Sequence, residues 1–230
     1  RVITRSLARS IIGQFSFQFG VNDRNRGSLN SSVDFRRAVA HALDREALAA
    51  LPSWINSGAL SSFLDLTPLA GGDGWDRYSY DPDLAEALLE DACAEVGRDC
   101  RIERPVVVVT TTAEGSLRAE LGGKVAEMLD AIGCDARLAV EDAALFFGPT
   151  FARGDWDLGL WAWEQEAGLS GVGRTLAHWD PAGPPPQGLN YARWGTPAVS
   201  GQGENFDQEA SPAAGTATAA YAALLEEMRR

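Results

Sequence analysis

Lysine and histidine are scarce in this sequence. Lys124 is the only lysine among 230 residues, His41 and His178 are the only histidines, and the formal net charge is −12. Nucleic acids and anionic membranes bind basic surfaces, so the composition argues against both as partners. No window approaches the ~18 consecutive apolar residues of a membrane-spanning helix. The sequence therefore predicts an acidic globular protein.

The motifs of common enzyme classes are also missing. The chain has no Gly-x-Ser-x-Gly elbow and no HExxH pair, and Gly122-Gly123-Lys124 falls inside a predicted helix without the Ser or Thr that follows in a phosphate loop. Asp155 and Asp157 look like a carboxylate pair, but they alternate with Leu158 in a predicted strand, which favours structural roles. We expect no catalytic residues, no metal site and no cofactor.

Three cysteines, Cys93, Cys100 and Cys134, fit no zinc-binding spacing. Cys93 and Cys100 flank a short polar turn and would form a disulfide in an oxidising compartment, which leaves Cys134 as a buried thiol. Cys100 with Cys134 is the alternative pairing, because both precede neighbouring predicted strands. A fully reduced chain is the third possibility.

Strands and helices alternate in the middle of the chain. Strands are predicted over 105–110, 136–140 and 156–162, with a helix from Ser116 to Gly133 and a short helix after Asp142. This order predicts a mostly parallel sheet with right-handed crossovers. Ligands of such sheets bind beyond the carboxyl ends of the strands. The segment 163–166, Trp-Glu-Gln-Glu, is therefore the first candidate site.

The flanking segments carry further signals. Residues 14–19 alternate strictly and predict a half-buried strand, and a helix is expected to begin near Asp34. Asp44 and Asp81 are predicted N-caps, the second with Pro82 at the first helical position. Residues 195–215 are rich in Gly, Ser, Pro and Ala and are expected to be mobile, and a helix is expected over 216–230.

Four segments together resemble one family. The helix over 33–45 contains D-F-R-R-A and ends A-L-D-R, residues 80–89 read Y-D-P-D-L-A-E-A-L-L, residues 131–136 read A-I-G-C-D-A, and residues 154–157 read G-D-W-D. In this order and at these separations they resemble the extracellular solute-binding proteins of family 5, the peptide, dipeptide and nickel binding components of ABC importers.

The resemblance implies an α/β fold, a periplasmic-binding-protein-like type II lobe with a mixed, mostly parallel sheet flanked by helices. Residues 1–230 would form the C-terminal lobe of a two-lobed protein, with the N-terminal lobe, the signal peptide and any lipid-anchored cysteine before Arg1. It also implies a monomer outside the cytoplasm, in the periplasm or on the outer face of the membrane, that delivers its ligand to ABC permease membrane subunits.

Ligand-contacting residues follow from the same resemblance. In peptide-binding members a Trp and then an acidic residue follow the G-d-f-D motif, and here Trp163 and Glu166 match them. An ammonium group could be held by the carboxylate and by cation–π contact with the indole. The complete set of candidate ligand-binding residues comprises Trp161, Trp163, Glu164, Glu166, Asn190 and Tyr191.

Two other classes of function stay open at this stage. One is a sensor or interaction lobe that works without a transporter. The other is an enzyme that hydrolyses small substrates, which substrate turnover would reveal. The ligand itself is not determined by the sequence.

Overall fold

A computed structural model describes residues 11–19, 29–51, 77–113, 116–164 and 188–194, together with residues 174, 177, 178 and 180. The expected helix over 216–230, the loop over 195–215 and Glu166 lie outside these residues. The described elements are β1 (Ile11–Phe17), η1 (Leu29–Ser31), α1 (Val33–Ala42), α2 (Arg45–Ala49), α3 (Pro82–Glu95), β2 (Val106–Thr112), α4 (Ser116–Ala131), β3 (Asp135–Glu141), α5 (Ala143–Leu145), η2 (Phe146–Thr150), α6 (Phe151–Arg153) and β4 (Leu158–Glu164).

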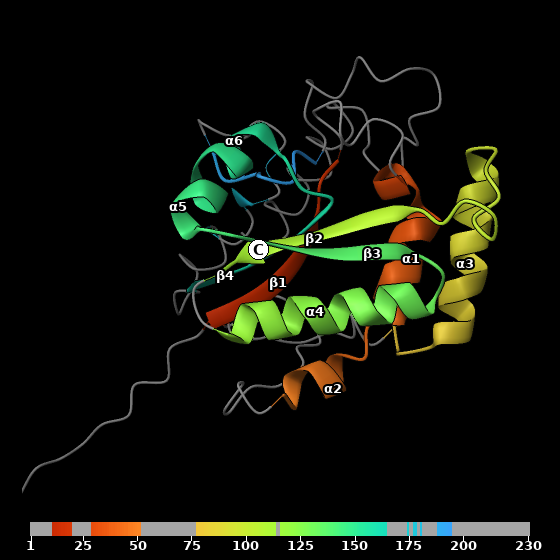
Figure 1. The fold of residues 1–230 in the computed structure, drawn as a ribbon. Coiled ribbons are helices and arrows are strands. Elements are labelled where there is room, and N and C mark those ends of the chain that lie inside the picture. Colours follow the sequence, from red (N-terminus) through yellow and green to blue (C-terminus); the bar gives the residue numbers. More distant parts are fainter. Residues whose placement is uncertain are drawn as a thin grey trace, which may run out of the picture.

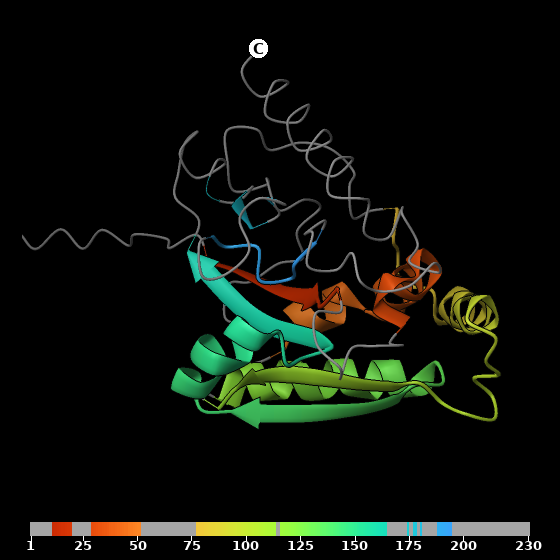
Figure 2. The ribbon, with the colours of Figure 1, turned by 90° about the horizontal axis from the view of Figure 1, so that it is seen from above.

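The four strands form one sheet in the order β1-β4-β2-β3 (Figures 1 and 2). β2 pairs in parallel with β3 and with β4, whereas β1 pairs antiparallel with β4. Helix α4 connects β2 to β3 and lies along the sheet (Figure 1). The predicted mixed, mostly parallel α/β sheet is therefore confirmed.

One face of the sheet is covered by helices α1, α3 and α4. Leu158 and Leu160 of β4 and Val107 and Val109 of β2 pack there against buried residues of these helices, such as Leu129. Burying such side chains supplies the main driving force of folding. Phe15 and Phe17 of β1 also pack against this core, so odd-numbered residues of β1 face the helices.

Short polar caps start the helices where the sequence predicts them. The side chain of Asp81 accepts a hydrogen bond from the backbone N–H of Leu84 at 3.0 Å, and Asp44 accepts one from Ala47 at 2.9 Å. Helix α4 ends at Gly133, whose φ of +105° favours glycine. These interactions fix where each helix begins and ends.

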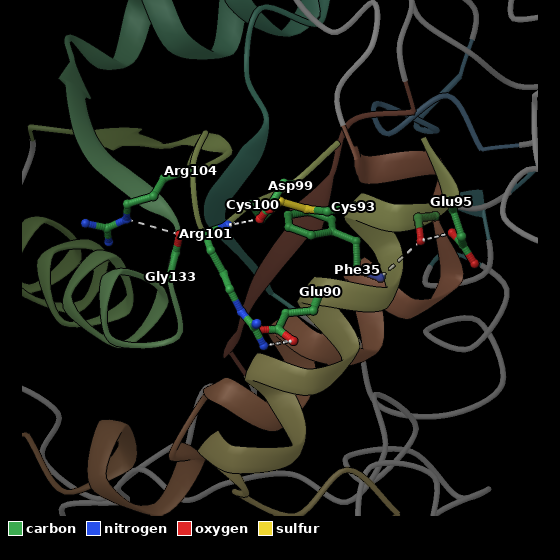
Figure 3. The surroundings of a disulfide bond; sticks show 10 residues. Phe35, Glu90, Cys93, Glu95, Asp99, Cys100, Arg101, Arg104 and Gly133 are labelled. Carbon is green, nitrogen blue, oxygen red and sulfur yellow. Dashed lines mark hydrogen bonds and ion pairs between the residues drawn. A yellow bond between two sulfur atoms is a disulfide. The ribbon is translucent and has the colours of Figure 1, made fainter. Parts of the chain in front are cut away.

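The disulfide joins Cys93, near the end of α3, to Cys100 in the turn that leads to β2 (Figure 3). Their Cα atoms lie 5.9 Å apart, within the range that a disulfide spans. Cys134 is a buried free thiol, and burial raises its pKa to about 12. Of the pairings that the sequence leaves open, the structure thus contains the local one.

Two arginines next to this disulfide hold the turn in place. Arg101 forms a two-pronged ion pair with Glu90 of α3, at 2.5 and 2.6 Å. Arg104 donates to the backbone carbonyls of Asp130, at 2.9 Å, and of Gly133, at 3.1 Å, at the end of α4 (Figure 3). The turn is therefore tied to both α3 and α4 before the chain enters β2.

Candidate functional site

Strands β1 and β4 present an aromatic and polar face on the side of the sheet opposite helices α1, α3 and α4. In their antiparallel register Gln14 lies opposite Trp161 and Ser16 lies opposite Gly159. Directly opposed residues share a face of the sheet. Since Phe15 faces the helices, Gln14, Ser16 and Trp161 face the other way.

Trp161 belongs to a second, smaller core on this face. Its ring packs edge-on against Phe151 at 4.9 Å and against Trp156 at 5.9 Å between centroids. Phe146 and Trp156 are fully buried in the same cluster. Segment 143–157, which contains α5, η2 and α6, therefore covers this part of the sheet and holds the indole of Trp161 in place.

Gly159 makes this packing possible. A Cβ atom at this position would lie 2.7 Å from Cζ3 of Trp161 and 3.0 Å from two ring atoms of Trp156. Such distances are too short for any side chain, so the two indoles meet over bare backbone. A glycine in a strand often marks a close approach of this kind.

Trp163 lies two residues further along β4 and is half-buried. Its indole stacks on the imidazole of His178, with centroids 4.7 Å apart and planes inclined by 22°. Burial lowers the pKa of His178 from 6.5 to about 4, with a smaller contribution from the charge of Arg174. The imidazole is therefore neutral at pH 7, and the pair forms a flat, uncharged wall.

The segment 188–194 borders this wall. The backbone N–H of Phe19 donates to the carbonyl of Ala192 at 3.1 Å, and the side-chain amide of Gln18 donates to the carbonyl of Tyr191 at 3.1 Å. Arg193, which has a φ of +59°, donates to the carbonyl of Ala152 in α6 at 2.6 Å. The segment is thus fastened both to the end of β1 and to α6.

These elements enclose a narrow depression. Its lining comes from β1, β4 and the two later segments, and comprises Gln14, Ser16, Trp161, His178, Leu189, Tyr191 and Ala192. The Tyr191 ring packs against Phe151, with centroids 4.6 Å apart, which connects the depression to the second core. The arrangement offers flat aromatic surfaces beside hydrogen-bonding side chains, which is the usual composition of a small-molecule site.

The structure brings together Trp161, Trp163 and Tyr191 of the residues that the sequence proposes as ligand contacts. Asn190 is fully buried, and its side chain stabilises a turn: its amide donates to the carbonyls of Asp180, at 3.0 Å, and Trp194, at 2.8 Å. Glu164 is exposed at the end of β4. Strand alternation puts it on the face opposite Trp163.

One boundary in the sequence prediction is wrong. The third strand of the central unit was expected over 156–162, with the candidate site beyond it, but β4 runs from Leu158 to Glu164. It continues because Ile11 and Ile12 of β1 pair with Glu164 and Trp163. Trp163 and Glu164 are therefore part of the sheet and do not lie in a loop after it.

Gln14, Ser16 and His178 were absent from the sequence-based site. The alternation of residues 14–19 could have indicated the first two, because it separates them from the phenylalanines. No pattern marks His178, which reaches Trp163 only through tertiary packing.

Two classes of site were searched for within the described ranges. No group of three His, Cys, Asp or Glu side chains there could hold a metal ion. Nor is any helix in that part of the chain long and apolar enough to cross a membrane.

Comparison with known families now identifies the chain. Residues 8–169 match the family model "Bacterial extracellular solute-binding proteins, family 5 Middle". The chain belongs to this family. Proteins of family 5 are extracytoplasmic, and the family consists of binding proteins and not of enzymes. No curated protein sequence matches the chain significantly.

Solved structures of solute-binding proteins share the fold. An ABC transporter substrate-binding protein from Listeria monocytogenes, CtaP, is 18% identical with a TM-score of 0.62, and the match covers 81% of this chain and 35% of that one. The periplasmic murein tripeptide binding protein MppA is 15% identical with a TM-score of 0.62, over 95% of this chain and 40% of that one.

A third structure, described as the peptide-binding protein of a peptide ABC transporter, has 14% identity and a TM-score of 0.62. There the match covers 90% of this chain and 94% of the other. The family 5 chain thus spans well under half of CtaP and MppA but nearly all of this third structure. At these identities the similarity concerns the fold alone.

Proposed function

We propose that this chain is the ligand-binding part of the substrate-binding component of an ABC importer. It captures a small solute, a peptide or a related amine-bearing compound, in a cleft shared with a further lobe, and delivers it to membrane permease subunits. The single observation that carries the assignment to this face is the half-buried indole of Trp163, stacked on His178 at the end of β4.

The chemistry of the site supports this assignment. Trp161, Trp163 and Tyr191 form an aromatic wall that is fixed from behind by the second core. Aromatic faces attract ammonium groups, and a nearby carboxylate strengthens the attraction. Glu166 is the carboxylate that we assign to the ammonium, with Glu164 adding negative charge at the exposed end of the strand.

The family membership supports transport over the alternatives. Solute-binding proteins close two lobes around a ligand by hinge motion, and the closed form is what a permease would recognise. A sensor lobe without a transporter remains the second candidate function. Capture of the permease subunits by the ligand-loaded protein would separate the two, because a sensor would not bind them.

The direct test is native mass spectrometry of the full-length protein, purified gently from its own host. We expect a co-purifying mass that is lost when Trp163→Ala is combined with Glu166→Ala. The matched control combines Leu84→Ala with Glu86→Ala, two exposed positions on α3 that lie away from the site. A bound mass that survives the first pair of substitutions would place the ligand elsewhere.

A further inference from the structure

The depression beside Trp161 is lined only by groups that carry no charge at neutral pH. Gln14, Ser16 and Tyr191 are polar and uncharged, and the remaining residues except His178 are apolar. His178 is neutral because burial lowers its pKa to about 4. A polar lining without charge is unusual in so acidic a chain, whose formal net charge is −12.

Such a lining discriminates between ligand groups. A charged group that entered would lose its hydration and find no counter-ion among the lining side chains, which is strongly unfavourable. An uncharged amide or hydroxyl would exchange its water for hydrogen bonds to side chains that both donate and accept. The penalty therefore falls on charged groups alone.

We infer that this depression is a specificity subsite for an uncharged group of the bound solute, and that Gln14 is the residue that determines the preference. The inference rests on the proposed function, since it assigns one part of the same ligand. For a peptide, the group is an uncharged side chain lying against Trp161, while the ammonium is held beside Trp163.

The geometry favours Gln14 for this role. It lies directly opposite Trp161 in the β1–β4 register, so its amide stands beside the indole. The surroundings are fixed before any ligand arrives, because Gln18 holds the backbone of Tyr191 and Arg193 holds the segment to α6. A preorganised site of this kind discriminates better than a mobile one.

The test measures binding of alanine tripeptides to the full-length protein by titration calorimetry, after bound solute has been removed. Each position of the tripeptide is replaced in turn by Gln, Glu, Lys or Leu. Gln and Glu have the same shape and differ in charge. At one of the three positions we expect Gln to bind at least tenfold more tightly than Glu or Lys.

Substitution of Gln14 then locates the preference. Gln14→Glu should improve binding of the Lys peptide at least tenfold at that position and weaken the Glu peptide further. Ser16→Asp, a second acid in the same depression, should act in the same direction if Gln14→Glu folds poorly. The control Ala94→Glu places the same charge on an exposed position of α3 and should change neither.

Each remaining outcome has a definite meaning. If charged and uncharged peptides bind equally at every position, or if neither acidic variant alters the preference, the subsite is wrong while the proposed function stands. If no tripeptide binds the unsubstituted protein at all, the proposed peptide ligand is wrong and the subsite falls with it.

Discussion

The side chain of Asp157 accepts a hydrogen bond from the backbone N–H of Val108 at 2.9 Å. Direct pairing between β2 and β4 is short, with only Val109 opposite Leu158 and Thr110 opposite Gly159. The carboxylate thus extends this join by one further bond. The backbone carbonyl of Asp157 also receives the side-chain amide of Asn30 at 2.9 Å, which connects the same point to η1.

Asp157→Ala should therefore destabilise the protein. It leaves a partly buried N–H of the central strand without its acceptor, which costs about 2 kcal/mol. The free energy of unfolding, measured by urea denaturation, is the readout. Asp135→Ala is the matched control, because it removes only an exposed ion pair with Arg137, worth ~0.5 kcal/mol. Equal losses in the two variants would contradict the role of Asp157.

Gly159→Ala should disturb the second core. The added methyl group meets the rings of Trp156 and Trp161, and overpacking of this kind costs roughly 1–3 kcal/mol. Tryptophan fluorescence and urea denaturation would detect the change. Gly123→Ala in α4 is the control: nothing lies within 4 Å of the new methyl group there, so this variant should gain about 0.5–1 kcal/mol. Parallel effects at both glycines would be inconsistent with close packing over Gly159.

Stability should fall in mild acid because of His178. Its pKa in the folded protein is about 4 and its ordinary value is 6.5, so between these values the unfolded chain holds a proton that the folded chain does not. The free energy of unfolding therefore decreases as the pH falls from 6.5 towards 4. His178→Gln should flatten this part of the profile and leave the slope above pH 6.5 unchanged. A profile identical to that of the unsubstituted protein would show that His178 is not buried as described.

Reduction of the disulfide should lower the melting temperature. A bridge over a sequence separation of 7 contributes roughly 2–3 kcal/mol by restricting the unfolded chain. Thiol counting provides the second measurement: alkylation in denaturant should modify one cysteine without reductant and three with it. Peptide mapping should find Cys93 linked to Cys100, and a peptide linking Cys100 to Cys134 would refute the assignment.

Much of this fold could be predicted because its signals are local. Asp81 followed by Pro82 starts a helix wherever it occurs in solvent, and Gly133 ends one because of its own backbone conformation. The alternation of Leu158 and Leu160 with Gly159 and Trp161 correctly separates the two faces of β4. These features depend on neighbours within a few positions.

The parts that could not be predicted depend on distant residues. The extension of β4 to Glu164 arises from pairing with β1, which lies far away in the sequence. The stacking of His178 on Trp163 and the burial of Asn190 likewise arise from tertiary contacts. The sequence indicated the aromatic part of the candidate site, but not its uncharged polar side.

The pairing of β1 with β4 also has a consequence for the order in which the chain can assemble. During synthesis β1 emerges early, while its only sheet neighbour, β4, follows after every other strand of the described sheet. The unit from β2 to β3 can form from contacts near in sequence, whereas β1 must wait for a long loop to close. A newly made chain therefore carries an unpaired strand with Phe15 and Phe17 uncovered, and we expect this to be the stage most sensitive to aggregation.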